Sequence, residues 1–161
     1  MDTARMRRVL ERISAPAPPP PRPGPGGPPP PPPEKLDALL DGEGQLLDLC
    51  REMRARSRAL GRELTGVERA SRRRREQLER RWFLDHGDRP PRPILPAERR
   101  RPGVSALLGE AWRQCGWLEK RYDELARNAP DREQRRLFAA LGRSAGESRR
   151  QLRFLMERAV R

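Results

Sequence analysis

The spacing of apolar residues is the feature that most constrains the fold of this chain. Four stretches, at about residues 36–60, 62–85, 104–128 and 130–159, repeat apolar side chains every three or four positions, which traces one face of a helix. No stretch shows the two-residue alternation of a half-buried strand. The pattern predicts an all-α fold, with a four-helix bundle over residues 34–161.

Each predicted helix turns one stripe of residues inward. The expected stripes are Leu36, Leu39, Leu40, Glu43, Leu46, Leu47, Cys50 and Met53; Leu64, Val67, Ser71, Arg74, Leu78 and Trp82; Leu108, Ala111, Cys115, Leu118, Tyr122 and Leu125; and Leu137, Leu141, Ala145, Ser148, Leu152 and Leu155. Gly61 is expected to separate the first two helices, because glycine near the end of a periodic run is a common stop signal. Gly87 should close the second helix, and Pro130 suits the first turn of the fourth, with Asp131 near its positive end.

Proline divides the remainder of the chain. Residues 16–33 are almost wholly Pro and Gly, which predicts an extended linker over residues 15–33, with a plain tether favoured over a Pro-rich recognition motif. Residues 1–14 are predicted to form a short amphipathic helix. Its apolar positions are Met6, Val9, Leu10 and Ile13. Residues 89–103 contain five prolines, cannot be helical, and have the length of a crossover between two antiparallel helix pairs.

Basic residues exceed acidic ones, 36 to 23, and all except Lys35 and Lys120 are arginines. Arginine binds phosphate in a bidentate manner, which makes nucleic acid an alternative partner. Coding bias in a GC-rich genome explains the same excess and is the favoured interpretation. The densest clusters form a candidate basic patch, for which a solvated face is the favoured role. The patch comprises Arg72, Arg73, Arg75, Arg99, Arg100 and Arg101.

Targeting signals and disulfide patterns are not evident. The first 14 residues lack the apolar core of a secretory signal, and no stretch approaches the ~18 apolar residues of a membrane span. Two cysteines, Cys50 and Cys115, are too few for a disulfide framework. The expectation is a cytoplasmic protein that does not contact a membrane.

One run of the third predicted helix carries a family resemblance. Residues 115–131 read Cys-Gly-Trp-Leu-Glu-Lys-Arg-Tyr-Asp-Glu-Leu-Ala-Arg-Asn-Ala-Pro-Asp, with Leu137 and Phe138 downstream. This resembles the rubrerythrin-type, ferritin-like family, in which a Tyr-x-x-Leu-Ala run leads through an Ala-Pro-Asp turn into the next helix. The resemblance spans residues 36–156 and implies a ferritin-like four-helix bundle. It also implies a di-iron site built from single Glu residues and Glu-x-x-His pairs.

The ligand positions implied by the resemblance are mostly occupied by other residue types. They fall on Glu43, Ser71, Arg74, Cys115, Ala145 and Ser148. Only Glu43 keeps a suitable ligand, and no Glu-x-x-His occurs in any register, since His86 is the only histidine. The sequence therefore predicts a lost metal site, no cofactor and no enzymatic activity.

Two of these positions are predicted to compensate each other. Glu43 and Arg74 should face one another across the first two helices, and a buried charge needs a partner. We expect a buried ion pair where the metal would stand, with Ser71 adding a hydrogen bond. The alternative is that Arg74 reaches solvent along its aliphatic stem. Cys115 is expected to be a buried apolar filler, in preference to a redox thiol.

Three function classes follow. The leading hypothesis is a non-catalytic, ferritin-like bundle that serves as a binding or scaffolding module, with an unknown protein partner or self-association. The alternatives are a basic nucleic-acid-binding helical protein and a residual metal-binding oxidoreductase of the ferritin-like family.

Overall fold

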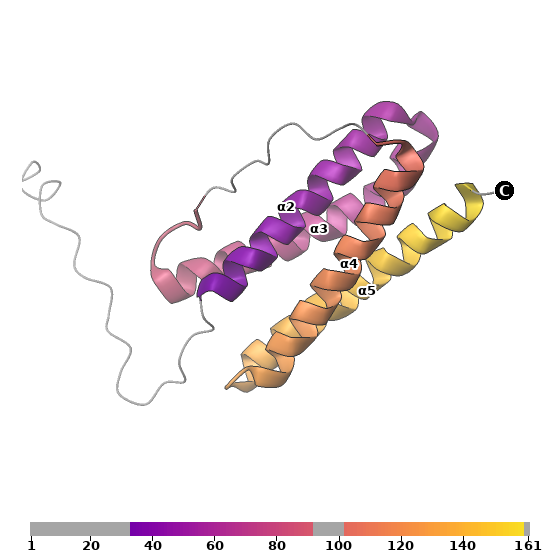
Figure 1. The fold of residues 1–161 in the computed structure, drawn as a ribbon. Coiled ribbons are helices and arrows are strands. Elements are labelled where there is room, and N and C mark those ends of the chain that lie inside the picture. Colours follow the sequence, from indigo (N-terminus) through magenta and orange to yellow (C-terminus); the bar gives the residue numbers. More distant parts are fainter. Residues whose placement is uncertain (1–32, 92–101, 160–161) are drawn as a thin grey trace, which may run out of the picture.

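The computed structural model describes residues 33–91 and 102–159, which form four α-helices (Figure 1). These are α2 (Pro33–Arg56), α3 (Arg58–His86), α4 (Val104–Asn128) and α5 (Arg132–Ala159). The described ranges contain no strand, so the all-α, four-helix prediction is confirmed. The helix expected at residues 1–14 lies outside the described residues, as do residues 15–32 of the expected linker; Pro33 is already the first residue of α2.

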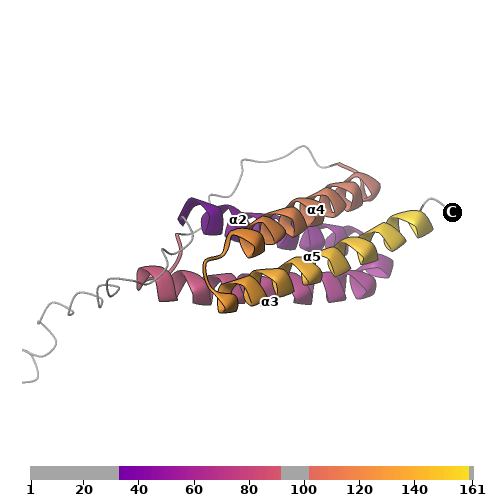
Figure 2. The ribbon, with the colours of Figure 1, turned by 90° about the horizontal axis from the view of Figure 1, so that it is seen from below.

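The four helices form a ring in which each contacts two others. α2 packs on α3 and α4, and α5 packs on α3 and α4, while the diagonal pairs make no close backbone contact. Seen from below, α2 and α4 form one layer and α3 and α5 the other (Figure 2). The core is the space enclosed by all four helices.

The break between the first two helices is at Ser57, and the prediction of a break at Gly61 is wrong. Ser57 adopts an extended backbone, and its side-chain oxygen accepts a hydrogen bond from the backbone N–H of Leu60. This is the geometry of an N-cap, which satisfies one of the free N–H groups at a helix start. Gly61 has no positive φ and lies inside α3. The cap outweighs the intrinsic preference of glycine for a helix end.

The other helix ends are close to those expected. Gly87 closes α3 in the left-handed conformation with φ of 77°, and its N–H donates to the carbonyl of Phe83. α5 starts at Arg132, two residues later than predicted, because the Asp131 carboxylate accepts from the backbone N–H of Gln134 and so holds the capping position. Residues 92–101, within the expected crossover, lie outside the described residues.

The expected inward stripes form the core, with one exception. All their members are buried except Leu137, which is half-buried. Close approach of the helices is helped by small residues: a Cβ on Gly42 would lie 2.8 Å from the Trp117 ring, and one on Gly146 would lie 2.6 Å from a Glu119 oxygen. Because the remaining faces are highly charged, none of the described helices is long and apolar enough to cross a membrane.

Candidate functional site

Glu43 and Arg74 meet in the centre of the bundle, in the arrangement expected from the sequence. Arg74 Nε donates to Glu43 Oε1 at 2.7 Å, and Nη2 donates to Oε2 at 3.0 Å. Their side chains are 0% and 1% exposed. This is a two-point pairing of a guanidinium with a carboxylate, the geometry that makes such pairs strong and directional. The alternative, in which Arg74 reaches solvent, does not occur.

Hydroxyl groups complete the site around the Glu43 carboxylate. Ser71 Oγ donates to Oε2 at 2.6 Å, as expected, and also lies 3.3 Å from the Glu43 carbonyl. Tyr122 Oη donates to Oε1 at 2.7 Å from α4. Each carboxylate oxygen therefore accepts two hydrogen bonds, one from Arg74 and one from a hydroxyl.

The opposite edge of the Arg74 guanidinium faces α5. Nη1 donates to Ser144 Oγ and to Ser148 Oγ, both at 3.1 Å. Ser148 is buried and Ser144 is partly exposed. Among the described residues, the only buried side-chain polar atom without a partner is Gln134 Oε1, which lies elsewhere on α5. The central cluster, defined as Glu43, Ser71, Arg74, Tyr122, Ser144 and Ser148, thus joins all four helices and is fully hydrogen-bonded.

Helix periodicity explains how these groups converge. Ser71 and Arg74 are three residues apart on α3, and Ser144 and Ser148 are four apart on α5, so each pair projects from one side of its helix. Glu43 is the only charged residue in the buried stripe of α2. The other buried acid of the described residues, Glu68, is paired with Arg54 and Arg72, which leaves Glu43 as the carboxylate available to Arg74.

The electrostatics of the cluster favour fixed protonation states. Burial alone would lower the pKa of Arg74, but the Glu43 charge and its hydrogen bonds outweigh this and raise it. Burial, together with the nearby Glu43 charge, raises the pKa of Tyr122 well above its ordinary value. Arg74 therefore stays charged and Tyr122 stays a neutral donor at physiological pH.

The two cysteines are buried and interact electrostatically with Arg74, and both are held in the protonated thiol form, which is not nucleophilic. Burial raises the pKa of the Cys50 thiol to about 12, with a contribution from Glu68. Burial also raises the pKa of Cys115 to about 12, where Arg74 lowers it and Glu43 raises it. Because the thiolate is the nucleophile, neither side chain has the properties of a redox or catalytic cysteine.

Four of the six implied ligand positions meet in the central cluster, and the other two are buried. Glu43, Ser71, Arg74 and Ser148 are joined directly by hydrogen bonds, and Cys115 and Ala145 are buried. This donor set does not fit a di-iron centre. It offers one carboxylate, and the cationic guanidinium of Arg74 already binds both oxygens of that carboxylate. In the described ranges no three His, Cys, Asp or Glu residues gather in a way that could hold a metal ion.

Three members of the cluster, Tyr122, Ser144 and Ser148, were not assigned to the ion pair from the sequence. Tyr122 was expected to face inward as the family tyrosine, but not to bind Glu43. Ser144 lies one turn before Ser148, and this four-residue spacing is the signal that could have identified it.

The candidate basic patch is not a continuous surface in the described residues. Arg72 pairs with Glu68 at 2.7 Å, and Arg75 pairs with Glu79 at 3.0 Å. Arg73 is exposed. The remaining members, Arg99, Arg100 and Arg101, lie outside the described residues. Consecutive arginines on a helix point in different directions, so a dense run in sequence does not become a patch.

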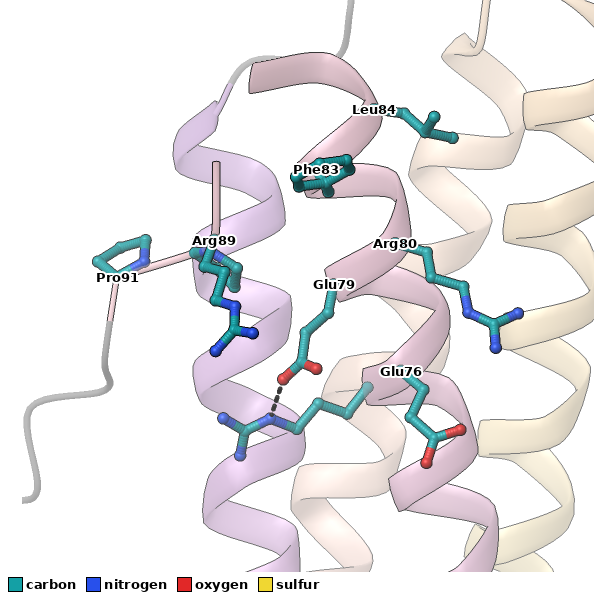
Figure 3. A pocket seen from close by; sticks show the side chains of 9 residues that line it. Glu76, Glu79, Arg80, Phe83, Leu84, Arg89 and Pro91 are labelled. Carbon is teal, nitrogen blue, oxygen red and sulfur yellow. Dashed lines mark hydrogen bonds and ion pairs between the residues drawn. The ribbon is translucent and has the colours of Figure 1, made fainter. Parts of the chain in front are cut away.

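A surface pocket lies at the C-terminal end of α3. It has a volume of about 760 Å³, and both charged and apolar side chains line it (Figure 3). Phe83 and Leu84 are exposed there, near the Arg75–Glu79 ion pair. His86, at the same end, stacks on Trp82 with ring centroids 4.1 Å apart and has Nδ1 3.0 Å from the Trp82 carbonyl. It contacts no member of the central cluster.

Comparison with protein-family models, with curated proteins and with solved structures found no match to this chain.

Proposed function

We propose that this chain is a ferritin-like bundle whose metal site has been replaced by an ion pair, and that it acts without catalysis as a binding or scaffolding module. The observation that carries the proposal is the position of the Arg74 guanidinium. It lies between Glu43 and the α5 serines, among the positions that the resemblance assigns to metal ligands. A fixed positive charge supplies there the electrostatic balance that a metal cation would otherwise give to Glu43.

Helix directions support the ferritin-like topology. Across α2 and α3, Glu43 meets Arg74 and Arg54 meets Glu68, so residue numbers run in opposite directions. The same holds across α4 and α5, where Glu119 meets Arg149 and a Cβ on Gly142 would lie 2.7 Å from Asp123. Two antiparallel pairs are the arrangement that the resemblance implies.

The ends of the connection between the pairs support a crossover. Arg56, at the end of α2, donates to the carbonyl of Pro102, just before α4. The end of α3 lies at the other end of the bundle, beside the start of α2 (Figure 1). The end of α3 and the start of α4 therefore lie at opposite ends of the bundle, as the two ends of a ferritin-like crossover do.

Burial favours a role at the surface over chemistry in the core. Glu43, Arg74 and Tyr122 are at most 1% exposed, so a substrate has no direct access to them. Each already uses its polar atoms for internal hydrogen bonds. A network of this kind fixes how four helices fit together, and the outer faces remain for a partner.

Metal analysis tests the loss of the site. Protein produced with added iron should contain well under one iron per chain and should show no peroxide-dependent oxidation. Stoichiometric iron or manganese with turnover would instead establish the oxidoreductase alternative.

A variant that introduces metal ligands tests whether Ser71 and Arg74 occupy the positions of a Glu-x-x-His pair. Ser71→Glu combined with Arg74→His restores a Glu-x-x-His on α3 beside Glu43 and should bind one Co²⁺ per chain, visible by its absorption spectrum. Adding Glu43→Gln should abolish that binding, since three neighbouring ligands become two. As a matched control, Arg69→Glu with Arg72→His places the same pair on the exposed side of α3 and should bind no more than wild type. Equal binding by both variants would contradict the proposal.

A further inference from the structure

Charge is divided unevenly between the two layers of the bundle. α3 and α5 together contain 17 arginines and eight acidic residues, a formal +9. α2 and α4 contain eight basic and ten acidic residues, a formal −2. Since α3 packs beside α5 and α2 beside α4, these totals belong to opposite faces of one molecule (Figure 2). The excess positive charge of the described chain is concentrated on the α3–α5 face.

A row of arginines runs along the outer side of α5. Its members are spaced by four, seven and seven residues, which keeps them on one side of the helix, and all are exposed. None forms an ion pair with a carboxylate of the described residues, and a shallow hollow follows the first part of the row. The row consists of Arg132, Arg136, Arg143 and Arg150.

A second row follows the outer side of α3. Its members are spaced by seven, four and seven residues, are exposed, and likewise form no ion pair within the described ranges. Figure 3 shows Arg80, at one end of this row, projecting from α3 on the side away from α2. The exposed acids of α3 and α5 are Glu76, Glu133, Glu147 and Glu157, fewer than the eight arginines of the two rows. The row consists of Arg62, Arg69, Arg73 and Arg80.

The dimensions of the two rows match a double-stranded polyanion. Arg132 and Arg150 are 18 residues apart, about 27 Å along the helix, which equals roughly eight phosphates on one strand. Packed helix axes lie about 8–10 Å apart, which is on the scale of a nucleic-acid groove. Guanidinium groups bind phosphate oxygens at two points.

Other anionic surfaces fit less well. Single strands are held by aromatic side chains interleaved with the basic ones, and membrane surfaces require an apolar face in addition to the charge. In the described residues the large exposed hydrophobic side chains are Phe83, Leu84 and Phe154, which lie beyond Arg80 and Arg150, the last arginines of the two rows. The two rows therefore provide positive charge, but no aromatic side chains on which bases could stack and no apolar face that could insert into a membrane.

We propose that the α3–α5 face binds the phosphate backbone of double-stranded nucleic acid without reading its sequence. This assignment rests on the proposed role of the chain as a binding module and names the class of its partner. It takes only Arg73 from the consecutive run Arg72–Arg75 on α3, because only residues at helical spacing form a continuous row.

The test is binding of the full chain to a labelled 20-base-pair duplex of arbitrary sequence, followed by fluorescence anisotropy between 50 and 200 mM salt. Arg136→Gln, Arg143→Gln and Arg150→Gln together form the test variant. The matched control carries Arg51→Gln, Arg113→Gln and Arg121→Gln on the α2–α4 face, with the same loss of net charge. Far-UV circular dichroism establishes that both variants fold.

We expect wild type to bind with a steep salt dependence. Each lost phosphate contact lowers the magnitude of the log–log slope by about 0.9, so the test variant should lose about 2–3 from the slope and at least tenfold in affinity at 100 mM salt. The control should change by less than threefold, because its charges lie on the opposite layer of the bundle and exposed charges are screened by salt.

Three results would overturn the assignment. They are an equal loss in both variants, the absence of salt-dependent duplex binding, and binding of wild type to phosphatidylserine vesicles but not to the duplex. None of them bears on the central cluster, which metal analysis and the Co²⁺ variant test separately.

Discussion

Arg74 and Arg143 place the same side chain in opposite surroundings of one bundle. Arg74 is buried and donates to Glu43, Ser144 and Ser148, whereas Arg143 is exposed and forms no ion pair within the described residues. A guanidinium inside the core must have its hydrogen bonds satisfied, because water cannot provide them. Outside, water does so, and the charge remains available to a partner. Burial therefore makes one arginine structural and leaves the other free for binding.

The largest effect should come from separating the buried pair. Arg74→Met leaves the Glu43 charge without its cation, and Glu43→Leu leaves Arg74 without its anion, so each should lower the free energy of unfolding by about 3–5 kcal/mol. The double variant should lose much less than the sum, as measured by urea denaturation in a double-mutant cycle.

The exposed counterpart provides the control for that cycle. Arg143→Met should change the free energy of unfolding by no more than about 0.5 kcal/mol. Absence of coupling between Glu43 and Arg74, or a similar loss at Arg143, would remove the distinction between interior and exterior arginines.

The second largest effect should be a fall in the free energy of unfolding at alkaline pH. The pKa of Cys50 and of Cys115 is raised from 9.0 to about 12 in the folded protein, so the unfolded chain loses these protons first. Stability should be unaffected below about pH 9 and fall as pH rises towards 12. The decline is about 1.4 kcal/mol per pH unit for each thiol, with Tyr122 adding to it above about pH 10.

Urea midpoints at pH 8, 9 and 10 measure this decline. Cys50→Ala combined with Cys115→Ala lowers stability at every pH by leaving cavities, but should flatten the profile between pH 9 and 10. An unchanged slope in that variant would assign the decline to other groups.

Tyr122→Phe should have an intermediate effect. It removes a 2.7 Å hydrogen bond to the Glu43 carboxylate while keeping the ring, and should cost about 1.5–3 kcal/mol. Ser148→Ala should cost about 1 kcal/mol, and Ser144→Ala less, because water can reach the partly exposed Ser144 site. Thermal unfolding ranks the three variants, and the reverse order would mean that burial does not govern the strength of the cluster.

The smallest effect should be found at an exposed ion pair with nearly the same N···O distance. Arg153 Nε lies 2.9 Å from Glu157 on α5, but the side chains are 72% and 59% exposed. Arg153→Gln should lower the free energy of unfolding by no more than about 0.5 kcal/mol, and less at high salt. A loss approaching that of Arg74→Met would show that distance, and not burial, sets the value of a pair.

The pairing of Glu43 with Arg74 was accessible from the sequence for a specific reason. Each is a charged residue inside an apolar stripe, and two opposite charges that must both be buried have few ways to be satisfied. Tyr122 and Ser144 were not accessible in the same way, since a neutral hydroxyl can be satisfied by its own helix or by water. The break predicted at Gly61 was wrong for a comparable reason. The cap at Ser57 depends on its extended backbone and on a hydrogen bond from Leu60, which the sequence does not specify.

The sequence by itself determined the four helices, the inward stripe of each and the presence of one acid and one base within those stripes. These properties follow from the period of a helix and are local to each segment. Only the tertiary structure decided which stripes meet, and hence that Tyr122 and the α5 serines complete the cluster. It also decided that α3 and α5, the two most basic helices, share a face. Periodicity fixes the direction in which a side chain projects from the axis of its own helix. The neighbour that the side chain contacts depends on how the helices pack.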